Sequence, residues 1–172
     1  MKDTKRLVYI SLLIAEALVL HIIEGMIPVP FITPGARLGF ANIITVISLY
    51  TLSYKDTAVV LFVRILLSVM FGGSISRLMY SLGGAVFSFI SMIIAINLFK
   101  DKVSIIGVSV IGAVFHNVGQ LIVASLIVET LGVMLYLPVM TIAAIGTGIF
   151  VGLTSNFAVN HLNKINKKLK MY

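Results

Sequence analysis

Six long apolar runs, separated by short polar, glycine or proline breaks, restrict the folds open to this chain. The runs span approximately residues 7–23, 38–53, 57–71, 78–99, 103–128 and 138–159. Of the 172 residues, 59% are hydrophobic and only 11% are charged, whereas soluble domains carry about 25% charged residues. We therefore predict an all-α integral membrane protein, with one transmembrane domain over 1–172 built from about six transmembrane helices.

The basic residues predict the orientation of this bundle. Ten of the thirteen Lys and Arg residues fall on one side of a six-span topology, at the two ends of the chain and in two connections between spans. These ten are Lys2, Lys5, Arg6, Lys55, Lys100, Lys102, Lys164, Lys167, Lys168 and Lys170. Because positive charge accumulates on the cytoplasmic side, we expect both termini in the cytoplasm of a multi-pass protein in the cell membrane.

Two features of the runs need an explanation. The second and third are short for a hydrocarbon layer of roughly 30 Å, so they extend through neighbouring breaks or are shielded by other helices. The first run follows basic residues as a secretory signal does, but it contains Glu16 and His21 and no small-residue cleavage site follows it. We expect a retained first helix.

The chain lacks the residues that several classes of function require. The chain has no cysteine, which excludes disulfides and thiolate chemistry. Its net charge of +7 follows the membrane topology, so we expect no nucleic-acid partner. A phosphate-binding loop, a zinc-protease motif and a nucleophile elbow are absent. We expect no catalytic residue, no resident metal and no cofactor.

Polar residues inside the predicted spans are the candidate functional residues, because burying them in a membrane is costly. The topology places most of them in the outer half of the bundle, where they would line a pocket open to the exterior. They are Glu16, His21, Glu24, Arg37, Asn42, Arg64, Arg77, His116, Asn117 and Gln120.

The three arginines in this set favour an anionic ligand, because guanidinium groups match carboxylate and phosphate oxygens. The competing interpretation has Arg64 paired with Glu16, and Arg77 with Glu24, as structural ion pairs. His21 and Glu24 share a helical face and could bind a metal, but two further ligands would be needed.

Four motifs carry a resemblance to a known family. They are Pro34 to Ile43 (PGARLGFANI), Phe71-Gly72-Gly73, Tyr80 to Gly84 (YSLGG) and Gly112 to Gln120 (GAVFHNVGQ). In this order they resemble the Gx transporter family, also named heptaprenyl diphosphate synthase component I. That family is similar to the substrate-binding S components of energy-coupling factor (ECF) transporters, which are six-helix membrane proteins.

The resemblance implies partners. The small residues Ser11 and Ala15 would lie on the first-helix surface that docks a transmembrane coupling subunit, and ATP hydrolysis would belong to separate ATPase subunits. Other small-residue pairs, such as Gly148 and Gly152, are expected to pack helices within the bundle.

The aspartate residues indicate whether this chain could itself be a prenyl diphosphate synthase. Prenyl chain elongation requires clustered carboxylates that hold magnesium on a diphosphate, whereas Asp3, Asp56 and Asp101 are isolated in the sequence. We expect no synthase activity from this chain alone.

The sequence therefore predicts a membrane subunit that binds a small anionic solute for uptake. Ligand contacts are expected from Arg37, Asn42, Arg77, His116, Asn117 and Gln120, with Glu16, His21, Glu24 and Arg64 as gate or support. The first alternative is a membrane accessory subunit of isoprenoid or menaquinone synthesis without transport of its own. The second is a membrane anchor within a redox or assembly complex.

Overall fold

The computed structural model describes residues 3–26, 39–70 and 75–169, without the side chains at 3, 75–77, 101 and 166–169. Within these ranges it consists of helices and contains no strand. They are α1 (Asp3–Met26), α2 (Asn42–Thr51), α3 (Tyr54–Met70), α4 (Ile75–Phe99), the 3-10 helix η1 (Lys100–Lys102), α5 (Ile105–Ile127), the 3-10 helix η2 (Leu131–Tyr136) and α6 (Leu137–Leu169). The predicted all-α architecture is confirmed.

The helices differ in how far they could cross a membrane. α1, α4, α5 and α6 each contain an apolar stretch long enough to cross one, whereas α2 has only ten residues. At 1.5 Å per residue, α2 is about 15 Å long, which is half of the hydrocarbon thickness. α6 continues to Leu169, beyond the expected end of its span at 159.

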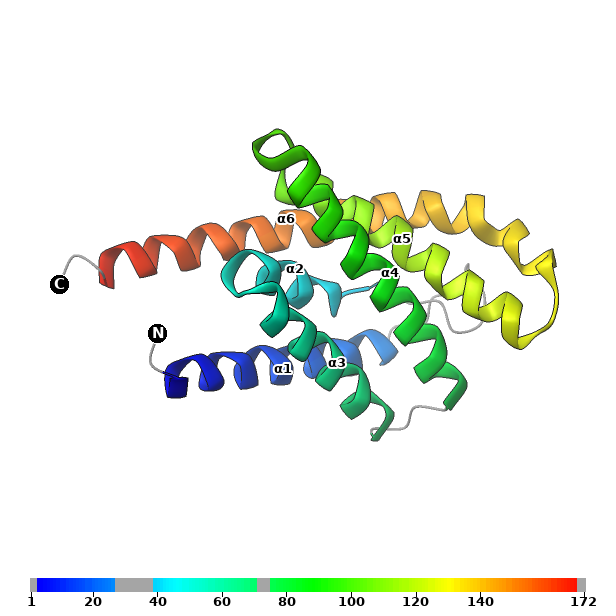
Figure 1. The fold of residues 1–172 in the computed structure, drawn as a ribbon, viewed down its shortest axis with the longest axis horizontal. Coiled ribbons are helices and arrows are strands. Elements are labelled where there is room, and N and C mark those ends of the chain that lie inside the picture. Colours follow the sequence, from blue (N-terminus) through cyan, green and yellow to red (C-terminus); the bar gives the residue numbers. More distant parts are fainter. Residues whose placement is uncertain (1–2, 27–38, 71–74, 170–172) are drawn as a thin grey trace.

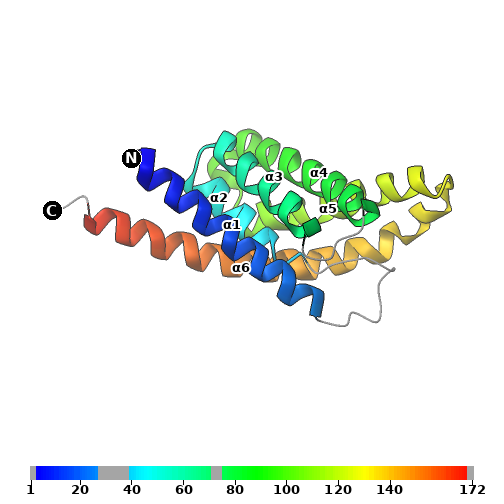
Figure 2. The same cartoon turned by 90° about the horizontal axis from the view of Figure 1, so that it is seen from below.

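The short helix α2 lies inside the protein. Figures 1 and 2 show it among α1, α3 and α6, and all seven residues from Ile43 to Leu49 are buried. A helix that is apolar on every face requires burial. Its faces are therefore covered by neighbouring helices, which explains how so short an apolar run is accommodated.

The outer surface of the bundle is apolar. Large side chains such as Leu66 on α3, Leu98 on α4 and Ile142 on α6 are exposed, and they are distributed over the long helices. Soluble proteins do not expose apolar surface on this scale. Together with the four long apolar helices, this surface identifies an integral membrane protein.

α4, α5 and α6 form a closely packed group. α4 and α5 make a hairpin through η1, and α6 returns along α5 (Figure 1). A Cβ atom added to Gly119 of α5 would lie 2.5 Å from the carbonyl oxygen of Gly83 in α4, and one added to Gly152 of α6 would lie 2.6 Å from Cα of Ile106 in α5. These glycines let backbones touch, as expected for Gly152 and for small residues between membrane helices generally.

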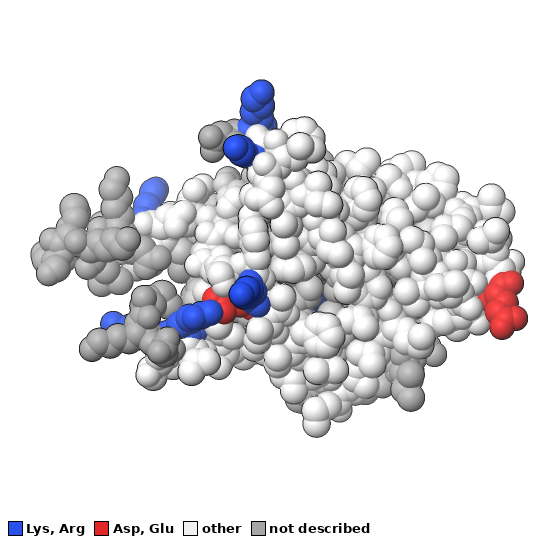
Figure 3. Space-filling view, viewed as in Figure 1, with Lys and Arg blue, Asp and Glu red and all other residues white. Residues whose placement is uncertain are grey.

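Charged side chains gather at the ends of the molecule. Figure 3 shows Lys and Arg near both termini and at η1, one acidic group among them, and another at the opposite end of the molecule, where α5 ends. At the basic end, the Arg6 guanidinium donates to both carboxylate oxygens of Asp56, with Nε 3.0 Å from Oδ2. Nearby, Tyr9 donates to Thr51 at 3.2 Å. These bonds attach the start of α1 to α2 and α3.

Candidate functional site

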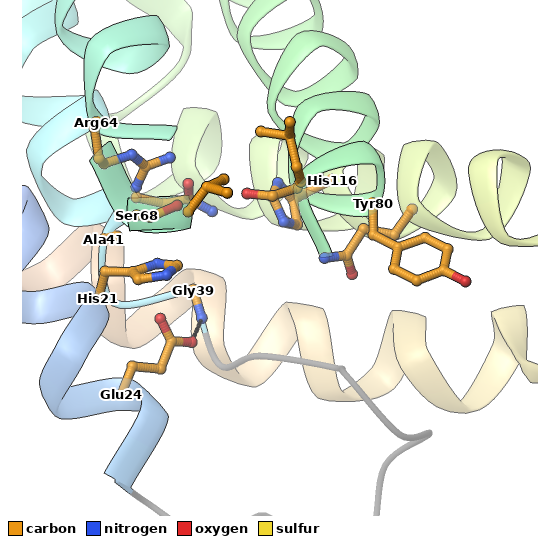
Figure 4. Close-up of a pocket in the computed structure, with 13 residues that line it drawn as sticks. His21, Glu24, Gly39, Ala41, Arg64, Ser68, Tyr80 and His116 are labelled. Carbon is orange, nitrogen blue, oxygen red and sulfur yellow. Dashed lines mark hydrogen bonds between the residues drawn. The ribbon is translucent and has the colours of Figure 1, made fainter. Parts of the chain in front are cut away.

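A polar cavity lies in the half of the bundle away from the termini. It has a volume of about 50 Å³, which is space for a few water molecules. α1, α3, α4, α5 and the turn before α2 contribute to its walls (Figure 4). The lining residues are His21, Glu24, Gly39, Ala41, Asn42, Arg64, Ser68, Val69, Leu78, Tyr80, Ser81, His116 and Gln120.

The last turns of α1 supply His21 and Glu24. The two residues are three positions apart, so the helix places them on one face. Glu24 is 4% exposed, and its Oε1 accepts a hydrogen bond from the backbone N–H of Gly39. Gly39 has a φ of 83°, which favours glycine, and its carbonyl accepts from Asn42 N at 2.8 Å at the start of α2. Glu24 thus fixes the entry of the chain into α2.

α3 supplies the positive charge of the cavity. Arg64 is 5% exposed and lies in the middle of this helix, with Ser68 one turn further on. In Figure 4 both side chains lie on the cavity side of α3, facing the α1 residues. Since a guanidinium group is expensive to bury within a membrane, its position at a polar cavity indicates a role in that cavity.

α5 supplies His116 and Gln120, four residues apart on one helical face. Gly84 of α4 packs against both: a Cβ atom there would lie 2.8 Å from Cε1 of His116 and 2.9 Å from Cγ of Gln120. The buried Nδ1 of His116 has no hydrogen-bond partner among the described residues. Buried polar atoms are nearly always paired, so this nitrogen is available to a ligand or to water.

The structure therefore brings together six of the residues singled out from the sequence: His21, Glu24, Asn42, Arg64, His116 and Gln120. Sequence reasoning did not select Ser68, Tyr80 or Ser81. Ser68 follows Arg64 by four residues on the same helix, a spacing that would have indicated it. Tyr80 and Ser81 stand in the YSLGG motif, which was used for resemblance and packing alone.

Two expected site residues lie elsewhere. Asn117 does not line the cavity, because its Nδ2 donates to the carbonyl oxygen of Met140 at 2.8 Å and so joins α5 to α6. Glu16 is exposed on the outside of α1 and has no hydrogen bond or ion pair with any described residue. The alternative Glu16–Arg64 ion pair is therefore not formed, whereas the expected contact of Asn117 with ligand stays a prediction, for a side chain that does not line the cavity in this structure. Asn117 directly follows His116 in α5, and one step along a helix turns a side chain by about 100° about the axis.

The remaining predictions fall on other parts of the chain. Arg37 and the side chain of Arg77 lie outside the described residues, so their predicted ligand contacts and the alternative Arg77–Glu24 pair stay predictions. Ser11 and Ala15 are exposed on the outer face of α1. The part of the chain that the structure describes contains no group of three His, Cys, Asp or Glu side chains that could hold a metal.

Comparisons with known proteins relate this fold to a family. The family model described as heptaprenyl diphosphate synthase component I matches residues 13–158. A solved structure of the S component of a bacterial ECF transporter is similar in fold, with a TM-score of 0.60 and 21% sequence identity; the match covers 99% of this chain and 100% of that chain. The search of curated proteins found no match. Because the family model spans the cavity and most of the bundle, this chain belongs to the heptaprenyl diphosphate synthase component I family.

Proposed function

We propose that this protein is a substrate-binding membrane subunit of an ECF-type transporter, which takes up a small solute carrying an anionic group. The observation that carries the proposal is the cavity inside an apolar bundle. It holds buried Arg64 and the Nδ1 of His116, which has no hydrogen-bond partner among the residues that the structure describes. The similarity of the whole fold to an ECF S component supports it. The chain would work in the cell membrane with a transmembrane coupling subunit and ATPase subunits.

Orientation follows from the charge distribution. The described Lys and Arg side chains on the surface lie mainly at the end that holds the termini and at η1 (Figure 3). If that end faces the cytoplasm, as the positive-inside rule requires, the cavity lies in the outer half of the membrane. A solute would then enter from the exterior. Since the cavity holds only a few waters, binding of a larger solute must move side chains or helices that line it.

The residues have separate parts in this proposal. Arg64 binds an anionic oxygen of the solute, and His116, Gln120 and Asn42 supply hydrogen bonds. Glu24 holds Gly39 and so shapes the wall of the cavity. Arg37 and Arg77 are proposed as further ligand contacts, and the exposed Ser11 and Ala15 as part of the surface that docks the coupling subunit.

The test begins with mass spectrometry of small molecules released from the purified protein, followed by titration with the solute identified. His116→Ala and Arg64→Lys should each weaken binding by about 10- to 100-fold, the loss expected for one hydrogen bond to a charged group. His161→Ala, which removes an exposed histidine near the end of α6, is the matched control. Unchanged binding in both cavity variants, with the bundle still folded, would overturn the proposal.

A second candidate function follows from the family name, which describes a component of heptaprenyl diphosphate synthase. In this role the chain would be a membrane accessory subunit, because its aspartates are not clustered and catalysis would belong to a soluble partner. Such a subunit should co-purify with a prenyl synthase and raise its rate, and it should release no bound solute. Those two measurements separate the candidates.

A further inference from the structure

An apolar groove lies on the outer surface of the bundle between α4 and α5, and it shares no described lining residue with the polar cavity. Its volume is about 490 Å³, within the range of small-molecule sites in proteins. The small residues Ser91 and Ala95, four positions apart on α4 and both buried, form its floor. Large apolar side chains form its walls: Phe87, Ile90, Ile94 and Phe99 on α4, and Ile111 and Phe115 on α5.

The groove offers an occupant apolar contacts. Among the described residues that line it, only Ser91 has a polar side chain, and its hydroxyl donates to the carbonyl oxygen of Ser88 at 2.9 Å within the same helix. This hydroxyl proton is therefore not available to a ligand. The part of any ligand that lies in the groove must be hydrocarbon, because a polar group there would have no hydrogen-bond partner.

The groove extends over one half of α4. Phe87 is the middle residue of this helix and lies twelve positions before Phe99, its last residue. At 1.5 Å per residue they are about 18 Å apart along the helix axis. Figure 1 shows α4 inclined to α6, so the depth along the bundle is less than this. The groove therefore reaches from the end of α4 to about the centre of a hydrocarbon layer roughly 30 Å thick, which is the depth of one lipid leaflet.

Two lysines follow the groove where α4 ends. Phe99 leads directly into η1, in which Lys100 and Lys102 are exposed and form no ion pair with a described residue. The intervening Asp101, whose side chain lies outside the described residues, leaves this turn with a net positive charge. Lys100 has a φ of 45°, a conformation in which glycine is usual after a helix. A lysine held in this conformation indicates a function for its side chain.

We propose that the groove binds one acyl chain of an anionic phospholipid of the cytoplasmic leaflet, with the lipid phosphate at Lys100 and Lys102. The positive-inside rule places η1 on the cytoplasmic side, where basic residues beside membrane helices bind such headgroups. A transmembrane helix of another protein could cover the groove, but its apolar surface would not engage the two lysines. The site is separate from the polar cavity, so it does not depend on the proposed function.

The test is native mass spectrometry of the purified protein, titrated in detergent with phosphatidylglycerol or with phosphatidylcholine of the same acyl chains. One phosphatidylglycerol should bind in preference. Lys100→Gly and Lys102→Ser should each weaken its binding about fivefold, the effect of one basic residue near a lipid headgroup. Ala95→Leu, which fills the floor of the groove, should weaken it at least tenfold. Lys5→Gln, which removes an exposed lysine of α1 at the same basic end, is the matched control and should leave binding unchanged.

Lys100→Gly also separates lipid binding from a structural role. Glycine relieves the left-handed backbone, so the lipid-free variant should unfold at an unchanged or higher temperature although it binds phosphatidylglycerol more weakly. Glu129, with a φ of 53°, is the other non-glycine residue with a positive φ in the described part of the chain. Glu129→Gly should have the same effect on stability and none on lipid binding.

Three outcomes would overturn the inference. Equal binding of the two lipids, or phosphatidylglycerol binding that is unchanged in all three groove and lysine variants, would show that the site does not recognise an anionic lipid. Displacement of phosphatidylglycerol by an equimolar prenyl diphosphate would assign the groove to that compound. A protein complex that is lost in Ala95→Leu and kept in both lysine variants would assign it to a protein helix. If Ala95→Leu does not fold, the lysine variants decide, since they replace exposed side chains.

Discussion

The two sides of the bundle are held together differently. α4, α5 and α6 touch through their backbones, at glycines that admit no Cβ atom. α1 instead packs its inner face on α2 and α3 and is fastened by side-chain bonds near both ends, from Arg6 and Tyr9 at its start and to Glu24 at its last turns. Its outer face is left uncovered (Figure 2).

The group of α4, α5 and α6 therefore forms a rigid scaffold, whereas α1 both lines the site and faces outward. The glycine contacts fix the α5 wall of the cavity, which carries His116 and Gln120. α1 contributes His21 and Glu24 to the opposite wall, and Glu16 to the outer surface. A partner seated on α1 would therefore touch the helix that forms one wall of the cavity.

The largest effect should come from the glycine contacts. Gly152→Ala places a Cβ atom 2.6 Å from Cα of Ile106, a backbone atom that cannot move aside cheaply. We expect it to lower the free energy of unfolding by about 3 kcal/mol, measured by denaturation in detergent micelles. Gly146→Ala in the same helix meets nothing within 4 Å and should be neutral or stabilising by up to about 1 kcal/mol. Equal effects would contradict backbone contact between α5 and α6.

The next effect should come from Glu24. Glu24→Leu removes the acceptor for the Gly39 N–H and should cost about 2 kcal/mol, whereas Glu24→Gln keeps an acceptor oxygen and should cost about 1 kcal/mol. Both are measured in the same unfolding assay. If the two variants are equally stable, the hydrogen bond to Gly39 does not hold the entry to α2.

The attachment at the start of α1 should respond to acid. Hydrogen bonds from Arg6, and then from Ser53, hold the pKa of Asp56 below its usual range. A carboxyl whose pKa is lowered on folding contributes stability that is present above its unfolded pKa, about 3.9, and is lost as the pH falls through the lower folded value. We expect that acidification below about pH 4 frees the start of α1, detected as faster hydrogen exchange there. Asp56→Asn should show this exchange already at neutral pH, and wild-type exchange in that variant would contradict the role of the pair.

The smallest effect is expected for Glu16→Leu in the isolated protein. Since no described residue bonds to Glu16, its replacement should change the free energy of unfolding by less than about 0.5 kcal/mol. A loss as large as that of Glu24→Leu would show that Glu16 has a partner inside this chain. The contrast between Glu24, which is bonded inside the bundle, and Glu16, which faces outward, would then be wrong.

Much of the fold was predictable, because hydropathy and helix formation are local. The apolar runs predicted the helices, and the small pair Gly148 and Gly152 predicted close helix packing that the structure shows. The second run was short in the sequence already, but the sequence left open whether it extends through a break or is shielded by other helices, since its apolar residues look the same whether protein or lipid covers them. For the site, the spacing of His21 and Glu24 and of His116 and Gln120 was informative. The four-residue spacing of Ser68 from Arg64 would have been informative too, whereas Tyr80 became visible only when its helix was placed.

The sequence by itself determined that this chain enters a membrane as helices, with its basic residues concentrated at one end, because these properties depend on each segment alone. Tertiary structure decided which polar side chains face the cavity: Glu24 turns inward and Glu16 outward on the same helix, and Asn117 turns away from His116. The reason is physical. Lipid and protein interior are both apolar, so hydrophobicity does not set the rotation of a membrane helix about its axis, and only packing against its neighbours does.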